Sequence, residues 1–145
     1  MNSLWNVPIS TVVSLSPERT VAVIRAIFRA ECGYAKLGPS GLTISDILMA
    51  PDGGIDAEIN AAQGQVILSD CIFQSGITGF QIKSGTTFKP WTSSAIRGEL
   101  LNSKGELCSE VGRLIQRKGH YTVICTGHDL TPEQRNKAKT LIKTV

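Results

Sequence analysis

The sequence lacks any apolar run that approaches the ~20 residues of a membrane-spanning helix, which excludes an integral membrane protein. Its first ten residues, MNSLWNVPIS, lack the charged and then apolar order of a secretory signal, so we expect a cytoplasmic protein. The order G-x-x-x-x-G-K-[ST] is missing as well, which disfavours a phosphate loop that cradles a nucleotide.

Paired cysteines are also lacking. The four cysteines are widely spaced, with no C-x-x-C pair and no histidine set nearby, so neither a zinc site nor a disulfide framework is expected. They are Cys32, Cys71, Cys108 and Cys125, and we interpret them as small buried hydrophobes.

The sequence has only a small excess of positive over negative charge. The formal net charge of +3 permits a polyanionic partner without predicting one. Basic residues gather in the C-terminal third, where they form either a phosphate-facing surface or the solvated outer faces of helices. They are Arg113, Arg117, Lys118, Arg135, Lys137, Lys139 and Lys143.

Local signals place three helical regions. Ser16 and Pro17 form a helix start, and the apolar spacing predicts a helix over 17–31 that stops at Gly33. A second region over 93–117 has helical spacing with interruptions at its glycines. A capping box that begins at Thr131 predicts a last helix still running at Val145, as in a domain cut from a longer polypeptide.

Alternating or short apolar segments predict four strands. They lie over 54–60, 65–68, 78–85 and 121–127, and the last is expected to be the clearest buried strand. In the first of them, Ile55, Ala57 and Ile59 should share one face, opposite an acid-bearing polar face. The order of elements indicates an α/β domain with a central mixed β-sheet flanked by α-helices, with parallel pairing where helices intervene.

The polar residues of two strands suit a hard cation. Asp56 and Glu58 project from one strand face, as do Gln81 and Lys83, so pairing of these strands would gather two acids, an amide oxygen and an ammonium. Mg²⁺ prefers oxygen ligands and keeps several waters, while a lysine beside it stabilises charge on a phosphate. The glycines at 53 and 54 allow a tight turn just before Asp56.

The segments DGGIDAEI and FQIKS resemble the active-site motif of the PD-(D/E)-x-K restriction-endonuclease-like superfamily, in its Mrr-like branch with a Q-x-K second half. The resemblance implies a restriction-endonuclease-like core in which Asp56 and Gln81 bind the metal and Lys83 is the catalytic lysine. Glu58 joins the catalytic residues, and Glu18 on the first helix completes the metal site. Gln81 replaces the usual acid and so removes one negative charge from the site.

The resemblance further implies a Mg²⁺-dependent DNA endonuclease, with Mn²⁺ able to substitute, in which Ser84 and Lys89 contact the substrate. Domains of this type serve as N-terminal effectors of bacterial antiphage defence proteins, so residues 1–145 are expected to form one nuclease-like domain. We expect it to assemble as a homo-oligomer through a fused region, because cutting both strands requires two sites. The alternative is a catalytically inactive nuclease-like module that binds DNA or a protein.

Overall fold

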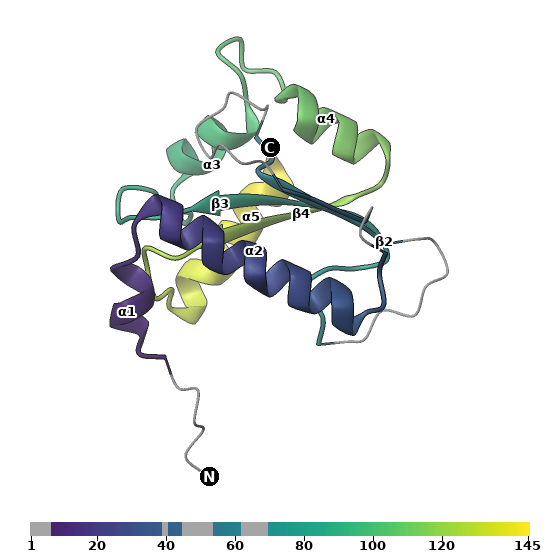
Figure 1. The fold of residues 1–145 in the computed structure, drawn as a ribbon. Coiled ribbons are helices and arrows are strands. Elements are labelled where there is room, and N and C mark those ends of the chain that lie inside the picture. Colours follow the sequence, from purple (N-terminus) through teal and green to yellow (C-terminus); the bar gives the residue numbers. More distant parts are fainter. Residues whose placement is uncertain (1–6, 39–40, 45–53, 62–69) are drawn as a thin grey trace.

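The computed structural model describes residues 7–38, 41–44, 54–61 and 70–145, which form an α/β arrangement with helices on both faces of a mixed sheet (Figure 1). In the described ranges the sheet has four strands in the order β1-β2-β3-β4. They are β1 (Leu42–Ile44), β2 (Ala57–Ala61), β3 (Gly76–Lys83) and β4 (His120–Cys125). β1, β2 and β3 pair antiparallel, whereas β3 and β4 pair parallel. The α/β class and the mixed sheet predicted from sequence are therefore confirmed.

The helices are α1 (Ile9–Val13), α2 (Pro17–Tyr34), α3 (Ser93–Leu100), α4 (Ser109–Gln116) and α5 (Pro132–Thr144). In Figure 1, α2 lies on one side of the sheet, and α3 and α4 lie on the other. Because α3 and α4 connect β3 to β4, this pair is parallel, as expected for a connection that contains helices. No helix in the described ranges combines the length and the apolar composition needed to cross a bilayer.

The face of the sheet under α2 holds the largest apolar cluster. Ile24 and Phe28 of α2 pack there against β2 and β3, and the rings of Phe28 and Phe80 lie 4.5 Å apart. The opposite face is covered by Ile96, Leu100 and Val111, which Leu141 and Ile142 of α5 join. The sheet is thus enclosed by apolar contacts on both faces.

The start of α2 is confirmed, but its predicted end at residue 31 is wrong. Ser16 Oγ accepts a hydrogen bond from the Arg19 N–H, and Pro17 is the first helical residue. The helix continues through Gly33 to Tyr34, and Lys36 then adopts the left-handed conformation with φ 54°. The left-handed residue that ends this helix is therefore Lys36, and Gly33 lies within the helix.

Two of the strand predictions need correction, and a third falls outside the described residues. Ile55 packs with Ile77 and Leu114 on the α4 side, whereas Ala57 and Ile59 belong to the cluster under α2, because β2 begins only at Ala57. Every residue of β4 is partly exposed, because this strand lies at the edge of the sheet, and β3 is instead the most buried strand. The strand predicted over 65–68 lies outside the described residues, as does Gly53.

Short elements escaped the sequence analysis. α1 and β1 have five and three residues, too few to show a periodic pattern. The helical region over 93–117 divides into α3 and α4, and the connection contains Gly105 with φ 78°. The capping box of α5 is confirmed: Thr131 Oγ1 accepts from the Gln134 N–H, and the Gln134 side chain accepts from the Thr131 N–H.

Candidate active site

Gln81 and Lys83 are alternate residues of β3, so both face the α3 and α4 side of the sheet. Asp56 precedes β2, and its carboxylate accepts a hydrogen bond of 2.6 Å from the Ile82 N–H. That N–H belongs to the peptide group joining Gln81 to Ile82, so the Asp56 carboxylate lies beside Gln81. The structure therefore brings together Asp56, Gln81 and Lys83.

This polar group is covered by protein. Asp56 is 3% exposed and Gln81 is 5% exposed, although both were expected on an open polar strand face. The Gln81 Oε1 atom is buried and has no hydrogen-bond partner among the residues that the structure describes. A buried carbonyl oxygen without a partner costs free energy, and the peptide N–H that follows this residue is bonded to the Asp56 carboxylate. A carboxylate and an amide oxygen on paired segments are the kinds of donor that suit a hard cation such as Mg²⁺.

Lys83 lies where the buried group meets the surface. Its Nζ atom is 2.7 Å from the Glu99 carboxylate of α3, and both side chains are about three-quarters buried, at 25% and 24% exposed. The same ammonium lies 5.7 Å from the centre of the Phe88 ring. An ion pair and an aromatic ring thus hold the lysine that the sequence motif predicts to be catalytic.

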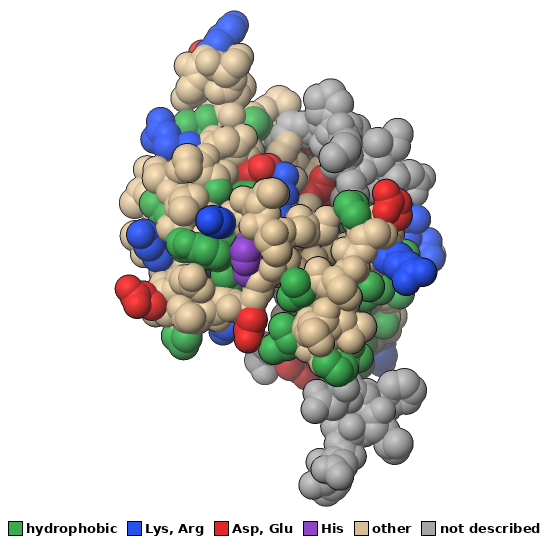
Figure 2. All heavy atoms as spheres, turned by 90° about the vertical axis from the view of Figure 1, so that its left-hand side faces the viewer, with side chains coloured by type: hydrophobic (Ala, Val, Ile, Leu, Met, Phe, Trp, Pro, Cys, Tyr) green, Lys and Arg blue, Asp and Glu red, His purple; other side chains and the backbone are tan. Residues whose placement is uncertain are grey.

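An open groove of about 670 Å³ begins at this lysine. Its lining includes the predicted substrate contacts Ser84 and Lys89, with further hydroxyl groups of Thr87, Thr92 and Ser94. Figure 2 shows the side of the molecule that carries the ends of β3 and β4, where acidic and basic side chains lie close together near the middle. The groove therefore combines the lysine ammonium groups and several hydroxyl groups, and through Lys83 it adjoins the buried Asp56 and Gln81.

The first turn of α3 faces the groove. Thr92, the residue before this helix, makes no side-chain cap, because its hydroxyl donates to the Lys89 carbonyl oxygen at 2.8 Å. Thr92, Ser94 and Ala95 all line the groove. The N–H groups at a helix start favour an anion, so this end adds to the attraction of the lysines.

Glu58 and Glu18, the other two acids predicted for the site, have different surroundings. The Glu58 carboxylate pairs with the guanidinium of Arg113 on α4, and Arg113 also pairs with Glu110. Glu18 is exposed in the first turn of α2, where hydrogen bonds from its own backbone N–H and from Ser16 lower its pKa. The contacts found for these two acids thus lie outside the group formed by Asp56, Gln81 and Lys83.

Two residues of the site carry no sequence signal: Glu99 and Tyr121. The parallel register pairs Tyr121 with Gly79, on the same sheet face as Gln81. Burial raises the pKa of the Tyr121 hydroxyl, and the charges of Glu99 and Asp56 raise it further. This hydroxyl donates to the Gly54 carbonyl oxygen at 3.4 Å. Both carboxylates therefore act on one buried hydroxyl.

Gly54 shows why the turn before Asp56 requires glycine. Its φ of 93° lies in the region that side chains disfavour, and an added Cβ would lie 2.9 Å from the Glu99 carbonyl oxygen. The turn therefore packs directly on the end of α3. This contact holds the Asp56 segment and the Glu99 segment together.

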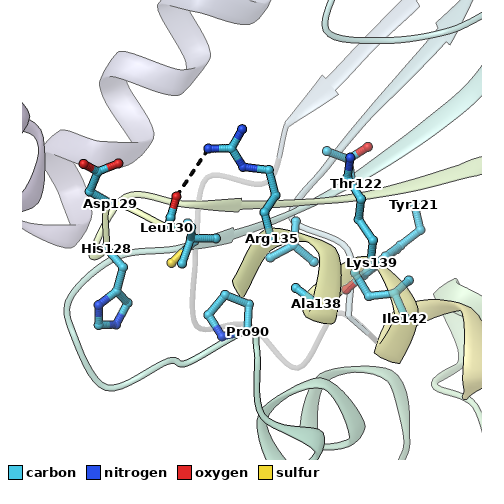
Figure 3. A pocket seen from close by; sticks show the side chains of 12 residues that line it. Pro90, Tyr121, Thr122, His128, Asp129, Leu130, Arg135, Ala138, Lys139 and Ile142 are labelled. Atoms are coloured by element: carbon cyan, nitrogen blue, oxygen red, sulfur yellow. Dashed lines mark hydrogen bonds between the residues drawn. The ribbon is translucent and has the colours of Figure 1, made fainter. Parts of the chain in front are cut away.

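A second cavity, of about 500 Å³, lies between β4 and α5 (Figure 3). Arg135 and Lys139 line it, and the Arg135 guanidinium donates to the Leu130 carbonyl oxygen at 3.4 Å. None of its lining residues lines the groove. Of the predicted site residues, Lys83, Ser84 and Lys89 line the groove and none lines this second cavity.

Among the described residues, no group of three or more His, Cys, Asp or Glu side chains is placed to hold a metal ion. All four thiols are free; Cys32 is buried and the other three are partly exposed. A cation site built from the described residues alone would therefore use amide or water oxygens besides its carboxylates.

No match was found in a scan against models of protein families, in a search of curated proteins or in a search of solved structures. An inference about function therefore rests on the geometry and chemistry of the site.

Proposed function

We propose that this protein is a Mg²⁺-dependent DNA endonuclease with a restriction-endonuclease-like core. The observation that carries the proposal is the buried Gln81 Oε1, which has no hydrogen-bond partner among the described residues and belongs to a residue two positions from Lys83, next to the peptide N–H that the Asp56 carboxylate accepts from. An apolar side chain would satisfy packing at this position without the cost of a buried carbonyl. A ligand that binds this oxygen explains why the polar group is there.

Asp56 and Gln81 are the residues that would hold the divalent cation. Bound Mg²⁺ supplies Lewis acidity to a phosphoryl group and lowers the pKa of a coordinated water. The hydrogen bond from Ile82 fixes the Asp56 carboxylate, so this oxygen donor is oriented before the cation arrives. This preorganisation favours binding despite the single carboxylate.

The remaining residues of the groove bind and position the substrate. Lys83 neutralises the charge that grows on the phosphate oxygens as a water oxygen bonds to phosphorus and one phosphate ester bond breaks. Lys89, Ser84 and the first turn of α3 suit the neighbouring phosphates of the strand. DNA in this groove would have its backbone held over the buried oxygens.

The motif resemblance extends the proposal to a biological role. Domains of this type act as effectors in bacterial antiphage defence, and we assign this role here on the resemblance alone. Assembly through a fused region would bring two sites to one duplex.

The second candidate is an inactive module that binds DNA or a protein. The ion pair between Lys83 and Glu99 favours it, because a lysine held by a carboxylate is less available to a phosphate. Cleavage activity distinguishes the two candidates.

The test is incubation of the purified protein with supercoiled plasmid, with Mg²⁺ or with EDTA. A nuclease nicks or linearises the plasmid only with Mg²⁺. Lys83→Gln should reduce the rate at least a hundredfold, since this variant removes the charge that opposes the developing negative charge. Lys104→Gln in the exposed connection between α3 and α4 is the matched control and should retain the rate. Metal-dependent DNA binding without any cleavage would instead support the inactive module.

A further inference from the structure

The end of α3 presents a carboxylate to the proposed site. Glu99 lies in the last turn of this helix, and its carboxylate lines the groove and pairs with Lys83 at 2.7 Å. The Glu99 side chain is 24% exposed, so it is mostly enclosed by protein but still reachable from the groove. It is the only acid among the described residues that line this groove.

The backbone around Glu99 is held in place. Its carbonyl oxygen accepts a hydrogen bond from the Cys108 thiol at 3.6 Å and packs against the Gly54 turn. Since Gly54 is two residues before Asp56, the backbone of Glu99 is held close to the segment that carries the other carboxylate. The Glu99 side chain extends from an anchored position.

Tyr121 also contacts the segment that carries Asp56. Burial raises the pKa of its hydroxyl, and the negative charges of Glu99 and Asp56 raise it further. The hydroxyl is also bonded to Gly54, whose segment leads into Asp56.

The charges of the proposed site explain what Glu99 would add. Asp56 carries one negative charge, Gln81 none and Lys83 one positive charge, so these three side chains sum to zero. A neutral set of residues attracts a divalent cation weakly, whereas a second carboxylate gives the set a net negative charge.

We propose that Glu99 supplies the second carboxylate of the divalent-cation site, in place of the charge that Gln81 lacks. This inference rests on the proposed function. In the absence of cation Glu99 pairs with Lys83, and on cation binding it turns to the metal and releases the lysine ammonium for a substrate phosphate. The same carboxylate thus couples metal binding to the availability of Lys83.

The experiment measures Mg²⁺ and Mn²⁺ affinity by isothermal titration calorimetry, without DNA. Glu99→Gln keeps the side chain's size and removes its charge, and it should raise the Kd for either ion at least tenfold. Glu110→Gln is the matched control, because Glu110 is an ion-paired glutamate of the neighbouring helix α4, and its Kd should stay within twofold of the wild type. Equal affinity of the wild type and Glu99→Gln would overturn the inference.

A second variant separates a ligand from a residue that only positions Lys83. Gln81→Glu returns a carboxylate to the motif, so combined with Glu99→Gln it should recover most of the lost affinity. A residue that acts only through Lys83 is recognised in a Lys83→Gln background, where Glu99→Gln would leave the Kd unchanged, whereas loss of a direct ligand still raises the Kd. An unchanged Kd in a folded Lys83→Gln, Glu99→Gln protein, checked by circular dichroism, therefore contradicts the assignment, as does failure of Gln81→Glu to recover affinity.

The outcomes also separate this inference from the proposed function. A wild type that binds neither Mg²⁺ nor Mn²⁺ overturns both. A wild type that binds the ions and cleaves DNA, with an unaffected Glu99→Gln, overturns only the role of Glu99.

Discussion

Replacing Gln81 by methionine should stabilise the protein in the absence of metal. Gln81 is 5% exposed and its Oε1 atom has no partner among the described residues. Leaving a buried polar group unsatisfied costs about 1–3 kcal/mol, and methionine fills a similar volume with a flexible apolar chain. After an allowance for imperfect repacking, Gln81→Met should raise the free energy of unfolding by about 1–2 kcal/mol. For a chain of this length that is a rise in Tm of roughly 3–8 °C.

Divalent metal should make the wild type more stable than Gln81→Met. Ligand binding at a hundredfold excess over Kd adds about 2.7 kcal/mol to the stability of the wild type. Gln81→Met lacks one of the proposed oxygen donors, so it should gain far less. The wild type is then the more stable protein with saturating Mg²⁺, and the variant is the more stable one in EDTA.

The assay is urea denaturation followed by circular dichroism, in EDTA and across a Mg²⁺ series. Gln116→Met at the exposed end of α4 is the control for the substitution itself, and it should change the stability by less than about 0.5 kcal/mol. A Gln81→Met protein that is less stable than the wild type in EDTA would refute the idea that Gln81 Oε1 is costly. An equal stabilisation of both proteins by Mg²⁺ would remove Gln81 from the cation site.

Further substitutions test the surroundings of the site. Gly127→Ala should destabilise the protein by about 2 kcal/mol or more, because its Cβ would overlap the Gly85 carbonyl oxygen in the loop after β3. The control Gly112→Ala has free space in α4 and should stabilise the protein by about 0.5–1 kcal/mol. Equal unfolding midpoints of the two variants would contradict the close approach of residues 127 and 85. Burial raises the pKa of Tyr121 above its ordinary value of 10, so its contribution to stability is complete below that pH and is lost as the pH rises further. The wild type should therefore lose more stability than Tyr121→Phe between pH 9 and 11 in urea titrations, and parallel curves would show that this hydroxyl is not buried.

Local sequence signals were sufficient for the elements that depend on near neighbours. The start of α2 and the capping box of α5 involve residues three apart, and both were predicted correctly. The same holds for Gln81 and Lys83, because alternate residues of a strand share a face in any sheet. At the level of sequence, the pairing of the Asp56 segment with this strand was only a condition for the site, and the structure shows this pairing.

The tertiary structure decided which polar residues lie with Asp56, Gln81 and Lys83. Glu58 pairs with Arg113, a residue 55 positions away, because α4 covers that part of the sheet. Glu99 meets Lys83 for the same kind of reason: α3 ends above β3. No periodicity within either segment contains this information, since it depends on which helix packs on which strand.

Burial was also decided by the arrangement of the sheet. A run of apolar residues predicted a buried strand at β4, yet the strand order places β4 at the edge, where its residues remain partly exposed. The polar side chains of Asp56 and Gln81 lie instead beneath the helices. The sequence alone therefore determined the α/β class and the residues of the motif. The packing of helices on the sheet determined that these residues are enclosed, because solvent exposure depends on contacts between distant segments.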